Sequence, residues 1–379
     1  MFQRLEDSHK EAQKITKIIT EVNTWPLERL REFAMRVFAS CGVPAEDAAR
    51  AADVLLTADL WGIDSHGVAR LRAYFEMLTR GLVNPRPRIK MLRELPATAL
   101  LDADNGLGLV VGPKANEMAM EKAQAVGSAW VSVCHSNHFG TAGYYPFKAL
   151  ERDLIGWAMT NTPPLVSPFG GAERMLGTNP LAVAFPGKDG PPVVIDMSTS
   201  GVSFGVVEMA MRKGQELPAG LLIDRGGKPT TRPHDFVHGG ALLPLGGDRI
   251  SGGHKGYCLA SMIDLLCGVL SGANWGPFIP PFPHDLKQPE RSVGKGLGHL
   301  FGAFRIDGFM EPDEFKRRVD EWRRVFRATK PAPQTEGVLI PGDPERAAEA
   351  RRINEGIPLA PSIISELHGL STQSGVPFE

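Results

Sequence analysis

Residues 181–196 read LAVAFPGKDGPPVVID, and this stretch decides how the sheet is built. Residues 181–185 and 193–196 are apolar runs rich in branched side chains, which is the pattern of two strands. The loop between them contains glycine and proline and is too short to hold a crossover helix. Since parallel neighbours need such a crossover, the two strands are expected to be antiparallel.

Three further runs with strand character precede this pair, at residues 99–102, 129–133 and 155–159. A helical pattern covers residues 112–126, between the first two runs, and another covers residues 138–150. Strands that alternate with helices favour parallel pairing. The predicted fold class is therefore α/β, with a mixed and partly antiparallel sheet that is flanked by helices.

The chain before the sheet is helical in pattern. Apolar residues recur at helical spacing over residues 27–38, 45–59 and 68–80, and Gly81 with the prolines after it ends the last run. Together these runs predict an N-terminal helical lobe over residues 23–95.

The other parts of the chain differ in composition. Residues 1–22 are polar and form a predicted extension with a marginal helix near its end. A mixed-sheet domain is expected over residues 96–304, and its stretch 271–302 is rich in glycine and proline, which predicts a long surface loop. Charged helices over residues 305–379 are expected to pack on the N-terminal lobe.

The overall composition narrows the class of protein. The 379 residues are 42% hydrophobic and 22% charged, which is ordinary for a globular protein. Lysine and arginine number 42 against 43 acidic residues, so no net charge favours nucleic acid or an anionic membrane, and small ligands are expected instead. The most apolar stretch, residues 259–270, is too short to span a membrane.

The N-terminus and the cysteines indicate a compartment. The first residues are charged where a signal peptide needs an apolar centre. The four cysteines are scattered, lack a Cys-x-x-Cys pair and lie in apolar surroundings, as reduced thiols do. A cytoplasmic location is therefore expected.

Residues 64–70, DSHGVAR, place several functional groups in the turn between two predicted helices. His66 and Arg70 are four residues apart, so they share a face if the helix begins near Gly67. The guanidinium can then bind a carboxylate with two hydrogen bonds beside the imidazole. A helix cap followed by a solvated arginine is the alternative explanation.

Two polar stretches follow predicted strands, where open sheets place ligands. His135 and His138 follow the strand 129–133, but no third residue at usable spacing completes a metal site, so no metal is predicted. Asp196 ends the predicted strand 193–196 and is followed by small hydroxyl residues at 198–200. The carboxylate of Asp196 can orient a histidine, and the hydroxyl groups can bind phosphate. The alternative is that these residues only cap the helix that follows.

No Gly-x-Gly-x-x-Gly dinucleotide motif and no Walker-type phosphate loop occurs in the chain. Residues 251–257, SGGHKGY, open an apolar helix instead. The glycines let the backbone approach a ligand, and Lys255 near the helix N-terminus supplies positive charge for phosphate. A plain glycine-rich turn is the alternative.

Residues 201–205, GVSFG, match the Gly-x-Ser-x-Gly nucleophile elbow of α/β-hydrolases. The elbow serine belongs at the end of a strand, whereas the predicted strand ends at Asp196, seven residues before Ser203. A serine hydrolase that uses Ser203 stays an alternative, as does a small-ligand binding protein without catalysis.

Five ordered motifs resemble the malate/L-lactate dehydrogenase family of the non-Rossmann type, whose members include ureidoglycolate, sulfolactate, diketogulonate and piperideine-2-carboxylate oxidoreductases. The motifs are DSHGVAR at 64–70, SNHFG at 136–140, PFGG with GTNPLA at 168–182, DMSTS at 196–200 and GHKGY at 253–257. The resemblance extends over about residues 27–360. It implies a homodimer on the family's own α/β fold, with the cofactor on the mixed-sheet domain.

The resemblance also implies a reaction. It is hydride transfer between NAD or NADP and a small 2-oxo acid, 2-hydroxy acid or related cyclic imine. In some relatives the residue that matches His66 is the proton donor, with a relay to the residues that match Ser65 and Asp196. Other members assign the acid–base role to the residue that matches His138.

Binding residues follow from the same resemblance. Arg70 would bind the substrate carboxylate, and Thr178 would line the pocket. The residues that match the cofactor site are Ser198, Thr199, Ser200, His254, Lys255, Gly342 and Asp343. Many relatives have a lysine where this chain has Val206, which leaves the choice between NAD and NADP open.

Overall fold

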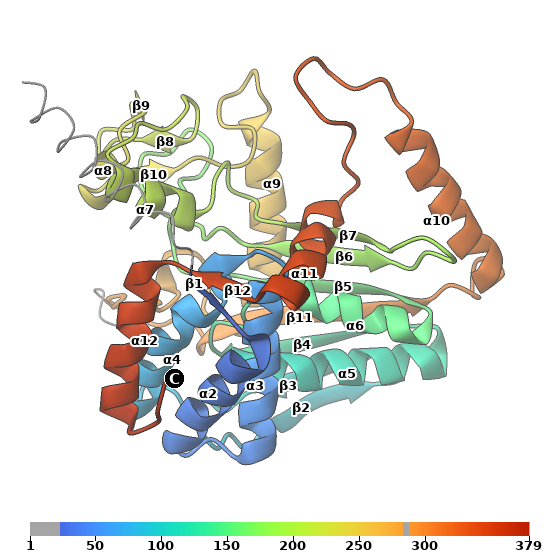
Figure 1. Ribbon diagram of the computed structural model, residues 1–379, viewed down its shortest axis with the longest axis horizontal. Helices are drawn as coiled ribbons and strands as arrows, with labels where there is room; N and C mark the ends of the chain where they lie inside the picture. Colours follow the sequence, from blue (N-terminus) through green and yellow to red (C-terminus); the bar gives the residue numbers. More distant parts are fainter. Residues whose placement is uncertain (1–22, 283–287, 379) are drawn as a thin grey trace, which may run out of the picture.

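The computed structural model describes residues 23–282 and 288–378. The extension over residues 1–22 lies outside the described residues. A seven-stranded mixed sheet runs through the centre in the order β2-β3-β4-β11-β5-β6-β7 (Figure 1). Its strands are β2 (Lys90–Leu95), β3 (Thr98–Asp102), β4 (Ser128–Ser136), β5 (Leu154–Thr160), β6 (Leu181–Phe185), β7 (Val193–Met197) and β11 (Leu297–Arg305).

The pairing of these strands confirms the predicted fold class. β6 and β7 are antiparallel, with Ala182 opposite Asp196. β3 and β4 are parallel, and α5 (Gly108–Val126) forms the crossover between them. The other neighbours in the sheet are antiparallel, so the described sheet is mixed and mostly antiparallel.

The central strand β11 is the main element that the sequence pattern missed. It begins inside the stretch 271–302, which was expected to be a surface loop, and it pairs with both β4 and β5. The glycines of β11 interrupt the apolar pattern of a strand, because other elements pack too closely there for a side chain. A side chain at Gly298 would collide with the carbonyl of Cys267, and one at Gly302 would collide with the ring of Trp130. The loop prediction was therefore wrong from Leu297 onward.

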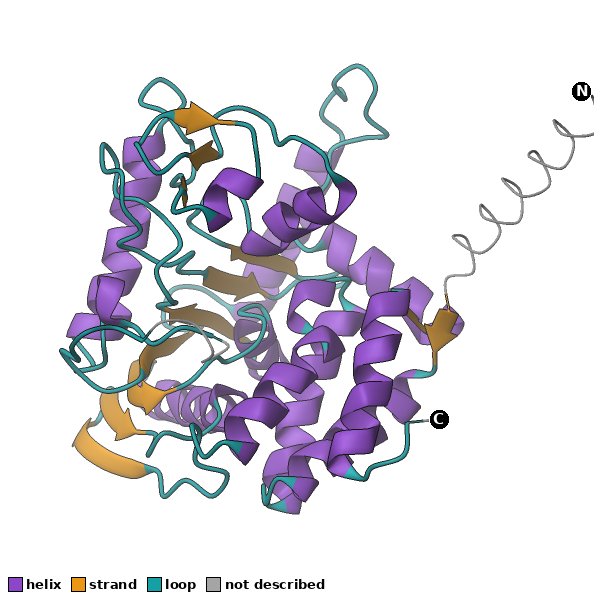
Figure 2. Cartoon of the chain, turned by 90° about the vertical axis from the view of Figure 1, so that its left-hand side faces the viewer, coloured by secondary structure: helices purple, strands orange, loops and turns teal. Residues whose placement is uncertain are grey.

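The N-terminal helices pack as a bundle beside the sheet (Figure 2). They are α2 (Leu27–Ser40), α3 (Ala45–Leu60) and α4 (Leu71–Thr79), and short 3-10 turns η1 (Asp64–His66) and η2 (Val68–Arg70) join the last two. The helix expected from residue 68 thus begins at Leu71, after η2. Leu30, Leu55 and Tyr74 are fully buried between these helices, and the same core continues into α5.

One further helix starts later than expected. The pattern over 138–150 predicted a helix from His138, but α6 spans only Tyr144–Ala149 and is followed by the 3-10 turn η3 (Leu150–Arg152). Residues 137–143 form a loop instead, because a carboxylate from β7 accepts hydrogen bonds from this segment. His138 is consequently held on a loop and not on a helix.

A smaller unit covers the end of the sheet where β7 stops (Figure 1). It contains α7 (Phe204–Lys213), α8 (His234–Val237) and the start of α9 (Gly253–Asp264). α9 continues as a π turn, η4 (Leu265–Val269), which packs on β4 and β11, and the 3-10 turn η5 (Gly276–Phe278) follows. A small antiparallel sheet, β10-β8-β9, completes the smaller unit with β8 (Leu222–Ile223), β9 (Pro229–Thr230) and β10 (Ala241–Leu242). In the described parts of the chain, no helix has the length and apolar character needed to cross a membrane.

The C-terminal elements lie on two sides of the molecule. α11 (Asp343–Glu355) packs on α3, and α12 (Pro361–Ser374) packs on α4. β12 (Ile357–Leu359) pairs with β1 (Asn23–Trp25), which ties both ends of the described chain together. α10 (Pro312–Arg327) stands apart beside the β6–β7 loop (Figure 1). The division into three domains stays a prediction, and its boundary at residue 95 falls after β2, which the hydrogen bonds place in the sheet.

Candidate active site

His66 and Arg70 come together through the shape of the turn between α3 and α4. The side chain of Arg70 folds back, and its Nε donates to the carbonyl of Ser65 at 2.7 Å. Its two terminal nitrogens have no hydrogen-bond partner among the described residues, so they are free to bind a carboxylate. The Ser65 hydroxyl lies 2.9 Å from His66 Nδ1. The two side chains are therefore neighbours for a different reason from the shared helix face that was expected.

Hydrogen bonds to buried groups hold this turn in place. Asp59 is 2% exposed, burial raises its pKa to about 8, and its carboxyl group accepts a hydrogen bond from the Val68 amide at 2.8 Å. A side chain at Gly67 would collide with that carboxyl group. Arg352 of α11 forms an ion pair with Asp64 and donates to the carbonyl of Asp59. The sequence pattern gave no sign of the contact between Asp59 and Arg352, since the two residues are 293 positions apart in the chain.

His138 meets His66 from the sheet side of the site. The two rings stack with centroids 5.6 Å apart and planes at 23°. The ring of Phe282 is also stacked with His138, at 4.6 Å and 9°. His138 Nδ1 lies 2.5 Å from the hydroxyl of Tyr74 and 3.3 Å from the amide of Gly140. In the described structure neither histidine has a hydrogen-bond partner at Nε2.

A third histidine lies behind this pair. His299 on β11 is fully buried, and its ring stacks on Phe139 at 4.9 Å. Its Nδ1 lies 2.7 Å from the Thr160 hydroxyl, and its Nε2 lies 2.8 Å from the Ser136 hydroxyl. It thus joins the ends of β4 and β5 where the His138 loop begins. Sequence reasoning missed His299 because it placed this residue in a loop.

Burial sets the charge of the two stacked histidines. Burial first, and the charge of Arg70 second, lower the pKa of His66 to about 4. Burial lowers the pKa of His138 well below its ordinary value, and His66, Arg70 and His299 act in the same direction. Both imidazoles are therefore neutral at neutral pH, next to the permanent charge of Arg70.

Asp196 lies at the end of β7 but does not bind a histidine directly. Its carboxylate accepts hydrogen bonds from the Gly143 amide at 2.7 Å and from the Thr141 hydroxyl at 3.1 Å. Burial raises its pKa to about 6, although these two hydrogen bonds act the other way. Asp196 therefore fixes the loop that follows His138, and its place in a proton relay stays a prediction.

The hydroxyl residues after β7 differ in availability. Thr199 donates to the carbonyl of Asn179 at 3.0 Å, and Ser200 donates to that of Val202 at 2.8 Å. Ser198 has only long contacts with Ser200, so it is the hydroxyl of the three that is most free for a ligand. Thr178 is half-buried, and its hydroxyl lies 3.3 Å from that of Thr162.

The remaining residues matched to a cofactor lie at two separate places. His254 and Lys255 are exposed in the first turn of α9, which begins after Gly252 with a positive φ of 95°. Gly342 packs beside Val194 at the start of β7, whereas Ser198 follows its end. The carboxylate of Asp343 accepts from the Ile340 amide at 2.9 Å and forms ion pairs with arginines 327 and 346. Its assignment to a cofactor site stays a prediction.

Ser203 does not form a nucleophile elbow. It is exposed, and it is the cap residue at the start of α7, after β7 has ended at Met197. Within the described residues no hydrogen bond joins its hydroxyl to a histidine. The strand–turn–helix geometry and the base that a hydrolase needs are thus both missing at this residue.

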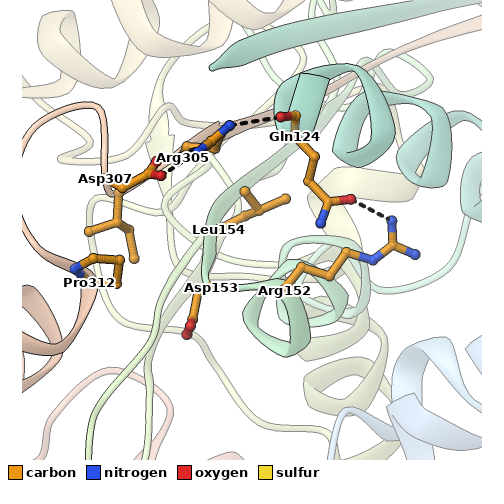
Figure 3. A pocket seen from close by; sticks show the side chains of 8 residues that line it. Gln124, Arg152, Asp153, Leu154, Arg305, Asp307 and Pro312 are labelled. Atoms are coloured by element: carbon orange, nitrogen blue, oxygen red, sulfur yellow. Dashed lines mark hydrogen bonds and ion pairs between the residues drawn. The ribbon is translucent and has the colours of Figure 1, made fainter. Parts of the chain in front are cut away.

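A cavity of about 280 Å³ lies at the other end of the sheet, where β5 starts and β11 ends (Figure 3). Its two arginines are engaged: Arg305 binds Asp307 and the Gln124 carbonyl, and Arg152 binds the Gln124 side chain and Glu117. This cavity therefore lacks the free donors that distinguish the pair of His66 and Arg70.

Metal chelators are expected to leave activity unchanged. Over the described residues, no group of three or more His, Cys, Asp or Glu side chains is placed to hold a metal ion. Activity measured after prolonged dialysis against a chelator should equal that of the untreated enzyme. A loss that a divalent cation restores would contradict this prediction.

The site brings together two stacked, neutral imidazoles and a guanidinium whose terminal N–H groups have no partner among the described residues, which are groups that acid–base chemistry on a small carboxylate can use. The chain belongs to the malate/L-lactate dehydrogenase family, whose model matches residues 25–368. It is therefore an oxidoreductase, and its family implies a nicotinamide cofactor.

Individual relatives match over nearly the whole chain. Malate dehydrogenase of Pyrococcus horikoshii is 41% identical over 352 residues, which cover 93% of this chain and 95% of the relative. L-sulfolactate dehydrogenase of Methanocaldococcus jannaschii is 40% identical over 352 residues, or 93% of this chain and 97% of the relative. The crystal structure of malate dehydrogenase from Entamoeba histolytica superposes with a TM-score of 0.88 at 33% identity, and the match covers 94% of this chain and 99% of that one.

Proposed function

We propose that the protein transfers a hydride between NAD or NADP and a small 2-oxo acid or 2-hydroxy acid of the malate or sulfolactate type, or a related cyclic imine. The observation that carries the proposal is the free end of the Arg70 guanidinium beside His66. Reduction of a 2-oxo acid needs a cation for the carboxylate and a proton for the developing alkoxide. Arg70 and His66 supply these two groups.

His66 is the group to which we assign the proton. Its Nδ1 is bonded to the Ser65 hydroxyl, which can donate or accept, so the ring can carry one proton or two without losing that contact. In reduction His66 gives a proton to the substrate oxygen, and in oxidation it takes a proton from the hydroxyl. A carboxylate bound to Arg70 offsets the charge that helps to lower the pKa of His66.

The residues around β7 and α9 fit a dinucleotide. The first turn of α9 carries the exposed Lys255, whose positive charge suits a pyrophosphate, and the hydroxyl of Ser198 has only long contacts with Ser200. When bound, the nicotinamide ring supplies or accepts the hydride. Val206, in the position of the lysine of many relatives, is exposed on α7, so the choice between NAD and NADP is left to experiment.

Two further expectations belong to the same proposal. A homodimer is expected from the family resemblance, and α10 carries an exposed pair of stacked rings, Trp322 and Phe326, that a second copy of the chain can cover. A cytoplasmic location is expected from the scattered cysteines, whose described side chains are all free thiols.

The purified protein is expected to oxidise NADH or NADPH with at least one member of a panel of 2-oxo acids and cyclic imines. The panel should contain oxaloacetate, 3-sulfopyruvate and pyruvate, because two relatives are named for malate and sulfolactate. Loss of nicotinamide absorbance is the measurement. Cleavage of p-nitrophenyl esters that depends on Ser203 would support the hydrolase instead, and binding without any turnover would support a binding protein.

A further inference from the structure

Tyr74 is placed on α4 so that its hydroxyl reaches one atom of the site. The side chain is fully buried, and its ring packs near Phe38 at 6.2 Å and Phe282 at 5.3 Å. Its hydroxyl lies 2.5 Å from Nδ1 of His138 and has no other hydrogen-bond partner in the described chain. A buried hydroxyl with one partner is under strong constraint, since an unmade hydrogen bond there is costly.

The direction of this hydrogen bond follows from its neighbours. Burial raises the pKa of Tyr74, so the phenol keeps its proton and is a donor. The amide of Gly140 points at the same nitrogen from 3.3 Å, and a backbone N–H can only donate. Two donors that face one lone pair leave no room for a proton on Nδ1. The proton of the neutral ring must therefore be on Nε2.

We propose that Tyr74, together with the Gly140 amide, is a positioning residue that locks His138 in the neutral Nε2–H tautomer. His138 then donates a hydrogen bond to the substrate oxygen without exchanging its proton, while His66 carries the proton of the reaction. The kinetic part of this inference rests on the proposed function, but the tautomer does not.

The two histidines differ in what they can do with a second proton. A proton on Nδ1 of His138 would break both of its hydrogen bonds, whereas the Ser65 hydroxyl can turn to accept one from His66. The charged or titratable groups that face His138 are Arg70, His66, His299 and Tyr74. Arg70 is a cation, and the other three are neutral at neutral pH, so no anion among them favours a charged His138.

The tautomer can be read directly from nitrogen magnetic resonance of protein labelled in its histidines. The His138 signals are assigned by their loss in His138→Gln. In the full-length protein we expect an unprotonated Nδ1 and a protonated Nε2 at every pH at which the protein stays folded. In Tyr74→Phe we expect a mixture of tautomers and the uptake of a second proton as the pH falls. A protonated Nδ1 in the unmodified protein, or an unchanged spectrum in Tyr74→Phe, would overturn the proposal.

Kinetics test the consequence for catalysis. Tyr74→Phe should lower kcat about tenfold, the rate equivalent of one lost hydrogen bond, and add a second ionisation to the pH profile. The matched control is Tyr145→Phe, because Tyr145 is equally buried and its hydroxyl donates to the carbonyl of Phe139 in the same loop. The control should keep the original His138 spectrum and the single ionisation.

The kinetic and spectroscopic results test the proposed function and the His138 tautomer separately. If Tyr145→Phe alters kcat and the pH profile as Tyr74→Phe does, the tyrosines merely support the loop, and the inference about Tyr74 is wrong. If no 2-oxo acid or imine is reduced but the spectra behave as expected, the proposed function fails while the assignment of the His138 tautomer stands.

Discussion

His66→Ala is expected to lower kcat by roughly a hundredfold or more, which is the usual contribution of a general acid, while cofactor binding persists. The reason is that the proton of the reaction is delivered only in the transition state, so its loss does not weaken ground-state binding. The measurement is steady-state kinetics with the best substrate of the panel, together with a fluorescence titration of the cofactor.

His138→Ala is the comparison that tests this assignment. Both rings are stacked in the same column, so either truncation opens a similar space beside its neighbour. If His138→Ala abolishes turnover while His66→Ala is mild, the two roles are reversed, and His138 is the acid–base group. If neither substitution matters, the active site lies elsewhere in the chain.

The pH dependence of kcat and kcat/KM is a second test of the role of His66. Oxidation needs the neutral ring, so kcat/KM for the hydroxy acid rises with pH through the pKa of about 4 and stays high above it. Reduction needs the protonated ring, so kcat/KM for the oxo acid falls as the pH rises through the same pKa. Because a bound carboxylate offsets Arg70, kcat for reduction should fall at a higher pH than kcat/KM does. His66→Ala should lack both transitions.

Parts of this fold could be predicted because a local pattern dictated them. The short loop after Phe185 leaves antiparallel pairing as the simple choice for β6 and β7, and the apolar face of α2 is regular. β11 could not be predicted, because Gly298 and Gly302 are selected by the packing of other elements and interrupt the strand pattern. Tertiary packing overrode local propensity there.

The candidate site also contains residues that the sequence predicts and residues that it does not. The groups that a motif carries, such as His66 and Arg70, are visible in the sequence, and the structure places them together with His138. Their supporting partners are not visible, because Asp59 and Tyr74 read as ordinary positions of helices and acquire a role only when the chain returns to them. Buried hydrogen bonds between segments far apart in sequence leave no periodic signal.

Arg70→Lys is expected to raise KM for the substrate about tenfold or more, with a smaller effect on kcat. Lysine keeps the positive charge but loses the two parallel N–H groups that bind both oxygens of a carboxylate, and a charge-assisted hydrogen bond is worth about 1.5–3 kcal/mol. It also loses the Nε donor to the carbonyl of Ser65, which holds the side chain beside His66. Initial rates over a range of substrate concentrations give the two constants separately.

Arg72→Lys is the matched control for this substitution. Arg72 lies in the first turn of α4, two residues after Arg70, is exposed, and pairs with Glu76 at 2.8 Å, so the same chemical change there should leave KM unchanged. Arg70→Gln extends the test, since it removes the cation that helps to lower the pKa of His66. The pKa should rise, and the fall of kcat/KM for reduction should shift to higher pH. An unchanged KM in Arg70→Lys with an unchanged pH profile in Arg70→Gln would show that the substrate carboxylate is bound by another residue.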